Sequence, residues 1–193
     1  HTNTSWDVAR FESCGKKWMD LSEGHYGVSL LNDCKYGHSV KDGCIGLTLI
    51  KSGIEPNPTT DQEEHFFTYA LYPHAEGWQQ AGTVREAYRL NQPALSVRGG
   101  QAGTEYSLAS VQPANVILET VKQAEDGNGV IVRLYETENA RTEACLTWNR
   151  PIASVEACNC IEEKQADAAF ERARIPFVIK PYEIKTFRIR EKE

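Results

Sequence analysis

The chain has 193 residues, of which 40% are hydrophobic and 25% are charged, so it falls in the ordinary globular range rather than the fibrous or disordered one. Its formal net charge is −6, and its lysines and arginines are scattered, which argues against binding nucleic acid or an anionic membrane surface. No apolar run approaches the roughly 20 residues that a membrane span needs. We therefore expect no nucleic-acid and no membrane partner.

The first residues carry large aromatic side chains and no polar lead-in. Trp6, Phe11, Trp18 and Tyr26 follow one another closely, and the only methionine is Met19. Aromatic side chains of this size need partners that cover them. We therefore expect the chain to be the C-terminal piece of a longer protein.

Apolar residues repeat with a period of two along most of the chain, which predicts half-buried strands rather than helices. Hairpin turns are expected at 41–43 and 126–129, because both segments contain an Asp and a Gly. Segment 56–64 is predicted to be a solvated loop. Segment 83–90 is predicted to form a helical turn that is too short to matter for the fold. The strands are predicted at 28–33, 45–50, 67–72, 108–111, 116–121, 130–135, 144–148, 155–160, 169–172, 177–179 and 184–189.

One change in composition divides the chain. Segment 96–106 has three glycines and no apolar period, which is typical of a linker or a long surface loop. Residues 106–193 hold enough strands for a β-sandwich of their own, whereas residues 1–105 hold too few to cover their tryptophans. The fold class is therefore all-β, with an incomplete sandwich at 1–105 followed by a smaller terminal sandwich at 106–193.

Catalytic and metal-binding motifs are not evident. The six cysteines show no regular spacing, which favours free thiols in a reducing compartment. His65 and His74 lie nine apart and would point to opposite faces of a strand, so they should not share a metal. A glycosidase needs a pair of carboxylates, but sequence alone pairs none of these candidates across a cleft: Asp7, Glu12, Asp20, Glu23 and Asp33.

The chain resembles the C-terminal β region of glycoside hydrolase family 38 α-mannosidases, most closely the cytosolic type. The resemblance covers nearly the whole chain and rests on the segments TSWDVARFE, KWMDLSE, YGVSLLNDCKYG, EEHFFTYALYPH, AGTVREAYRLNQP, NVILETVKQAEDGNGVIVRLYE and PYEIKTFRI. It implies that 1–105 is the C-terminal portion of a β-supersandwich and that 106–193 is the terminal β-sandwich domain.

The resemblance also implies a function. Family members are retaining α-mannosidases that hold zinc or another divalent ion, together with the Asp nucleophile, in an N-terminal barrel. Those motifs do not occur here, so we expect no cofactor and no catalytic residue in this chain. The expected role is to support the barrel of a cytoplasmic enzyme that acts on mannose-containing oligosaccharides, with the catalytic domain as partner and a homo-oligomer as an option.

One turn is the candidate substrate contact. In the family, the loop after the strand at 28–31 leans towards the barrel, and Asn32, Asp33, Lys35 and Tyr36 match that position. Their side chains can donate to and accept from sugar hydroxyls. The alternative is a turn in which Asn32 and Asp33 bond their own backbone. Other family members have Arg near Lys35, which leaves the specific contact open.

Two other classes of function remain open. A stand-alone carbohydrate-binding module would need an exposed aromatic platform, for which Trp78 is the best candidate, although a loop Trp more often folds back onto the sandwich. A purely structural or oligomer-forming domain would show a large exposed apolar patch.

Overall fold

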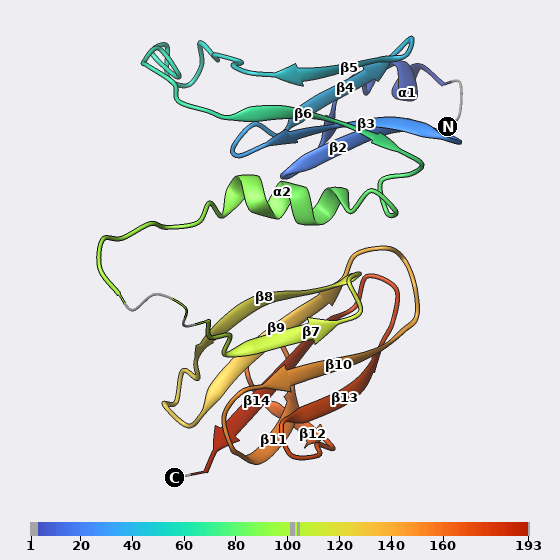
Figure 1. The fold of residues 1–193 in the computed structure, drawn as a ribbon. Coiled ribbons are helices and arrows are strands. Elements are labelled where there is room, and N and C mark those ends of the chain that lie inside the picture. Colours follow the sequence, from blue (N-terminus) through green and yellow to red (C-terminus); the bar gives the residue numbers. More distant parts are fainter. Residues whose placement is uncertain (1–3, 101–102, 104, 193) are drawn as a thin grey trace. The chain divides into compact units, whose positions relative to one another are not determined.

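The computed structural model describes residues 4–100, 103 and 105–192 (Figure 1). Contacts divide the chain into two compact units, His1–Arg98 and Gly99–Glu193. Segment 96–106, which the sequence indicates as a linker, contains this division. Every sheet pairing among the described residues joins strands of one unit, so each unit has its own sheets.

The described residues of the first unit form two three-stranded antiparallel sheets. One has the order β2-β3-β6, with β2 at Trp18–Glu23, β3 at Tyr26–Asn32 and β6 at Tyr69–Ala75. The other has the order β1-β4-β5, with β1 at Ser13–Cys14, β4 at Gly37–Lys41 and β5 at Cys44–Thr48. A short helix, α1 at Ser5–Ala9, precedes them.

Helix α2, at Thr83–Asn91, packs against β3 and β2. Thr83 and Ala87 lie one turn apart on the same face of the helix, and both are buried. The predicted helical turn at 83–90 is therefore a nine-residue helix that covers one face of a sheet, and the expectation that it is too short to matter was wrong.

The described part of the second unit is a sandwich of a five-stranded and a three-stranded antiparallel sheet. The larger sheet has the order β12-β11-β14-β9-β8, with β8 at Val116–Gln123, β9 at Val130–Glu136, β11 at Ile152–Cys158, β12 at Lys164–Asp167 and β14 at Ile184–Glu191. The smaller sheet has the order β13-β10-β7, with β7 at Ala109–Gln112, β10 at Thr142–Trp148 and β13 at Arg174–Ile179. Residues from both sheets, among them Leu134, Leu146 and Phe187, form one buried apolar cluster.

The turns follow the expected chemistry. Asp42 and Gly43 both have positive φ, as the tight hairpin between β4 and β5 requires. Gly127 and Gly129 do the same between β8 and β9. One strand prediction was wrong: 169–172 is not a strand, because Glu171 and Arg174 pair only as an isolated bridge that closes a tight turn. The all-β fold class is confirmed.

Candidate functional site

The turn after β3 holds the four predicted substrate-contact residues, and Asn32 is its internal support. Asn32 is fully buried. Its Oδ1 accepts a hydrogen bond from the Lys35 backbone N–H at 2.9 Å, and its Nδ2 lies 3.3 Å from Nε2 of the buried His38. Its carbonyl oxygen accepts a bond from the Asn91 side chain at 3.0 Å, which ties α2 to the turn. Asn32 therefore shapes the turn from inside and cannot reach a ligand.

Asp33 joins this turn to the start of β6. Its Oδ2 accepts from the Thr68 backbone N–H at 2.9 Å, and its own N–H donates to the Thr68 carbonyl at 3.2 Å. The hydrogen bond from Thr68 lowers the pKa of the Asp33 carboxyl below its usual value. The neighbouring Cys34 thiol has a raised pKa, because its hydrogen bond to Asp33 disfavours the thiolate.

Lys35 and Tyr36, the other two predicted residues, are half-buried and exposed, respectively. The Lys35 ammonium lies 4.9 Å from the centre of the Phe67 ring, and the Lys16 ammonium lies 5.9 Å from that of Tyr36. Tyr36 is 48% exposed. Of the four residues that the sequence grouped, Asn32 is buried, Asp33 and Lys35 are half-buried and Tyr36 is exposed, and the bonds of Asn32 and Asp33 fix the turn.

A buried polar network lies on the face of the same sheet that α2 covers. Asp20 Oδ2 lies 2.7 Å from His74 Nε2, and both side chains are almost completely shielded from solvent. The Ser29 hydroxyl donates to Asp20 Oδ2 at 2.7 Å and lies 2.7 Å from the Thr83 hydroxyl. Strands β2, β3 and β6 and helix α2 each contribute one group, so the network fastens the helix to the sheet.

This network is not a nucleophilic triad, although it contains Ser, His and Asp. A triad places the carboxylate on one ring nitrogen and the hydroxyl on the other. Here Asp20 and Ser29 both approach Nε2 of His74, at 2.7 Å and 3.2 Å. Ser29 is also completely buried. The arrangement therefore serves packing rather than acyl transfer.

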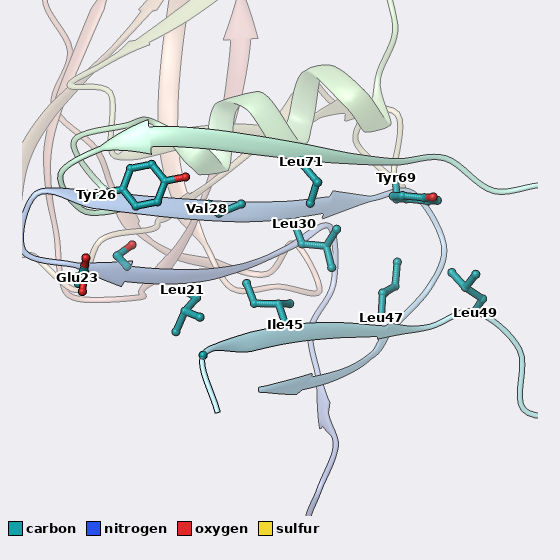
Figure 2. A pocket seen from close by; sticks show the side chains of 12 residues that line it. Leu21, Glu23, Tyr26, Val28, Leu30, Ile45, Leu47, Leu49, Tyr69 and Leu71 are labelled. Carbon is teal, nitrogen blue, oxygen red and sulfur yellow. The ribbon is translucent and has the colours of Figure 1, made fainter. Parts of the chain in front are cut away.

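The opposite face of that sheet is apolar and only partly covered (Figure 2). A cavity of about 760 Å³ lies between it and β5. Ile45 and Leu47 of β5 point towards Leu30 and Leu71 of the other sheet. Leu71 is 68% exposed and Tyr69 is 56% exposed, so the two sheets leave much of this interior open to solvent.

Trp78 does not form an exposed platform. Its ring packs against Trp18 with 5.0 Å between the centroids, and both side chains are half-buried. The Lys17 ammonium lies 4.4 Å from the centre of the neighbouring Tyr88 ring. The Trp78 loop thus folds back onto β2.

Among the residues that the structure describes, the other carboxylate candidates do not form a pair: Glu23 lines the cavity between the two sheets, and Glu12 holds a structural bond. Glu12 accepts a hydrogen bond from Thr48, whereas the side chain of Asp7 lies outside the described residues.

Within the described ranges, no group of three or more His, Cys, Asp or Glu side chains could hold a metal ion. All six cysteines are free thiols. No helix in the described part of the chain is long and apolar enough to cross a membrane.

Two family models match the chain. Glycosyl hydrolases family 38 C-terminal domain matches residues 1–59, and glycosyl hydrolases family 38 C-terminal beta sandwich domain matches residues 115–187. The alpha-mannosidase G of Dictyostelium discoideum is 40% identical over 201 residues, covering 97% of this chain and 18% of that protein. The alpha-mannosidase 2C1 of Homo sapiens is 42% identical over 167 residues, covering 84% of this chain and 16% of that protein.

A solved structure shares the fold. An alpha-mannosidase from Enterococcus faecalis V583 superposes with a TM-score of 0.70 at 22% identity, covering 92% of this chain and 21% of that one. The chain thus spans about a fifth of the length of the proteins that it matches.

Proposed function

The chain belongs to glycoside hydrolase family 38, whose C-terminal domains it matches, and on this premise we propose that it is the non-catalytic C-terminal β region of a retaining α-mannosidase. The proposed substrates are terminal α-D-mannosides of mannose-containing oligosaccharides. The proposed role of this region is to support the catalytic domain and to line one edge of its substrate pocket.

The open apolar face of the first unit is the observation that carries the supporting role. Monomeric proteins rarely leave a large contiguous apolar surface in water. Here a cavity of about 760 Å³ is lined mainly by leucine, isoleucine, valine and tyrosine side chains of two facing sheets. Leu71 would lose most of its exposed area if another element covered this face. We assign that cover to the N-terminal part of the same enzyme, including its catalytic domain.

The proposed edge of the substrate pocket is the pair Lys35 and Tyr36. An ammonium group and a phenol hydroxyl can both bond sugar hydroxyls, and the phenol ring adds an apolar contact. Asn32 and Asp33 act on the substrate only indirectly, since Asn32 Oδ1 and Asp33 Oδ2 accept from the backbone of Lys35 and Thr68, and Asp33 Oδ1 is buried. These bonds hold the turn that presents Lys35 and Tyr36.

A stand-alone carbohydrate-binding module has less support. The packing of Trp78 on Trp18 removes the aromatic platform that such a module would use. The divalent ion of the family, typically zinc, does not fit the described residues, because the buried Asp20–His74 pair supplies only two ligands and both already bond within the network. We therefore propose that the ion binds in the catalytic domain and that this chain supplies no ligand to it.

We further propose a cytoplasmic location. Six free thiols, four of them on the exposed residues Cys14, Cys34, Cys44 and Cys160, suit a reducing compartment.

The test compares the chain alone with the chain supplied with its proposed partner. The 193-residue chain should not hydrolyse an aryl α-mannoside, and co-expression with the N-terminal part of a family 38 enzyme that lacks this region should restore activity. Replacing Leu71 by Asp should block that restoration, whereas Val178→Asp, at a half-exposed apolar residue outside the cavity, should not. Hydrolysis by the chain alone would refute the proposal, and so would a stable dimer of the chain that buries Leu71 and persists in the presence of the N-terminal part.

A further inference from the structure

The second unit contains a cavity of its own at one end of the sandwich. Its volume is about 600 Å³, within the range of small-molecule pockets. Three segments build it: the turn between β10 and β11, the tight turn at 170–173, and Lys192 directly after β14. These segments are far apart in sequence and meet only through the fold.

Backbone hydrogen bonds fix the walls of this cavity. The Trp148 N–H donates to the Ala173 carbonyl at 2.8 Å, and the Lys192 N–H donates to the Pro151 carbonyl at 2.9 Å. The Asn149 side chain donates to the Ser107 carbonyl at 2.6 Å. The cavity is therefore formed before any ligand arrives, which lowers the entropic cost of binding.

The lining combines an apolar floor with cations. Pro151 and Phe170 supply apolar surface above the buried Trp148 and Ile152, and the basic side chains of Arg150, Arg172 and Lys192 stand around it. Such a lining, mostly apolar with a few charged groups, is typical of ligand pockets. No acidic side chain lines the cavity within the described residues, and Glu171 of the same tight turn is outside the lining.

One nearby carboxylate offsets only part of this charge. Glu191 accepts from the Trp148 indole N–H at 3.0 Å with one oxygen and from Arg150 at 3.2 Å with the other. Both carboxylate oxygens of Glu191 are therefore engaged, one by the Trp148 indole and one by Arg150 at the edge of the cavity. Arg172 and Lys192 line the cavity and form no ion pair with any residue that the structure describes.

The backbone at Arg172 is strained. Its φ is +54°, in the left-handed region that favours glycine, within a turn closed by two backbone bonds between Glu171 and Arg174 at 2.8 and 2.9 Å. A glycine would relieve this strain, yet the position carries a long cationic side chain that lines the cavity. Strained residues gather at ligand-binding sites.

We propose that this cavity binds a small organic anion, with a carboxylate or phosphate group held by Arg172, Lys192 and Arg150 and an apolar or ring-shaped body against Pro151 and Phe170. Arginine suits this role because its planar fork donates two parallel hydrogen bonds to such groups. This binding activity goes beyond the mannosidase role proposed above.

The experiment titrates the whole 193-residue chain at low salt and follows the Trp148 indole N–H signal by NMR. Phenyl phosphate, benzoate, inorganic phosphate and the neutral benzyl alcohol are the probes. Phenyl phosphate or benzoate should give saturable shifts of this signal, and whichever binds more tightly identifies the preferred group. Benzyl alcohol should give none, and inorganic phosphate should bind more weakly than phenyl phosphate.

Three variants make the result decisive. Arg172→Gly removes the cation and relieves the strain, so the affinity should fall about tenfold or more while the thermal midpoint stays equal or rises. Lys192→Gln should also weaken binding, and Arg174→Gln, an exposed cation outside the lining, should leave it unchanged. Unchanged affinity in Arg172→Gly and Lys192→Gln, or no saturable shift with either organic anion, would overturn the proposal. Equal binding of inorganic and phenyl phosphate would overturn the role of the apolar floor.

Discussion

Asp20 and His74 lie 54 residues apart in sequence, yet carboxylate Oδ2 and imidazole Nε2 are 2.7 Å apart inside the first unit. Their strands, β2 and β6, are not hydrogen-bonded to each other and are both neighbours of β3. The side-chain contact therefore spans the sheet across β3, where Ser29 bridges the pair and passes the network on to Thr83 of α2.

Replacing Asp20 by Ala should destabilise the first unit by about 2–4 kcal/mol, because Ser29 and His74 would keep buried polar atoms without their acceptor. Urea unfolding followed by tryptophan fluorescence measures the change. Glu23→Ala, at an exposed carboxylate of the same strand, should stay within about 0.5 kcal/mol. Equal effects of the two substitutions would show that the network contributes nothing.

Gly27 tests how closely this network is packed. A Cβ built at Gly27 would overlap the His74 ring and the Ser22 hydroxyl, both of which bond Asp20. Gly27→Ala should therefore cost about 1–3 kcal/mol through overpacking. Gly24→Ala is the matched control, since the Cβ position there meets nothing within 4 Å. A tolerated Gly27→Ala, judged by the same urea midpoint, would contradict this geometry.

The buried carboxyl of Glu136 should make the stability of the second unit depend on pH. The residue is 1% exposed. Burial opposes its ionisation, but hydrogen bonds from the N–H groups of Tyr182 and Glu138 and from the Asn115 side chain outweigh this and lower the pKa of the Glu136 carboxyl below its usual value of 4.5. A carboxyl with a lowered folded-state pKa adds stability above its unfolded pKa, and this stability is lost as the pH falls through the folded value.

Glu136→Gln should therefore be less stable than the unsubstituted chain at pH 7 by about 1–3 kcal/mol, because an amide cannot accept all of these bonds. The difference should shrink as the pH falls from 4.5, where the unfolded carboxyl takes up a proton, towards the lower pKa of the folded state. Unfolding curves from pH 7 to pH 3 measure this, with Glu143→Gln at an exposed position as the control. A difference that is constant with pH would show that ionisation of Glu136 is not linked to folding.

The strands that could be predicted are those in which one face is buried and the other is more exposed. The segment 130–135 alternates because one face enters the sandwich core, and β9 forms there. Strand β2 escaped prediction because its first four residues are all half-buried, which leaves no alternation. Helix α2 was underestimated because a short helix gains its stability from packing, here of Thr83 and Ala87, rather than from its own sequence.

The candidate site was predicted only in part, for a similar reason. Asn and Asp serve equally well as ligands for hydroxyls and as partners for backbone groups, so residue type could not decide between the two. The backbone-bonding alternative is favoured by contacts with His38, Thr68 and Asn91, which lie next to the turn only in the folded chain. The buried network had one local signal: Ser29 stands among the apolar residues 28–31, where a hydroxyl needs a buried partner.

The division within the turn gives the last prediction, which uses a full-length family 38 enzyme that carries this region. Lys35→Met keeps the packing over Phe67 and removes the charge. If Lys35 bonds the sugar, the KM for an aryl α-mannoside should rise about tenfold, as expected for one lost charge-assisted hydrogen bond, while the thermal midpoint stays unchanged.

Asn32→Ala should change the thermal midpoint rather than the KM. It removes the buried bonds to His38 and to the Lys35 backbone, so the thermal midpoint should fall by several degrees, in line with a loss of about 1–3 kcal/mol. Lys41→Met, at an exposed lysine at the end of β4, controls for a general charge effect on KM. An unchanged KM in Lys35→Met would remove Lys35 from the substrate edge. The turn would then act only as a support, because Asn32 and Asp33 already bond within the fold.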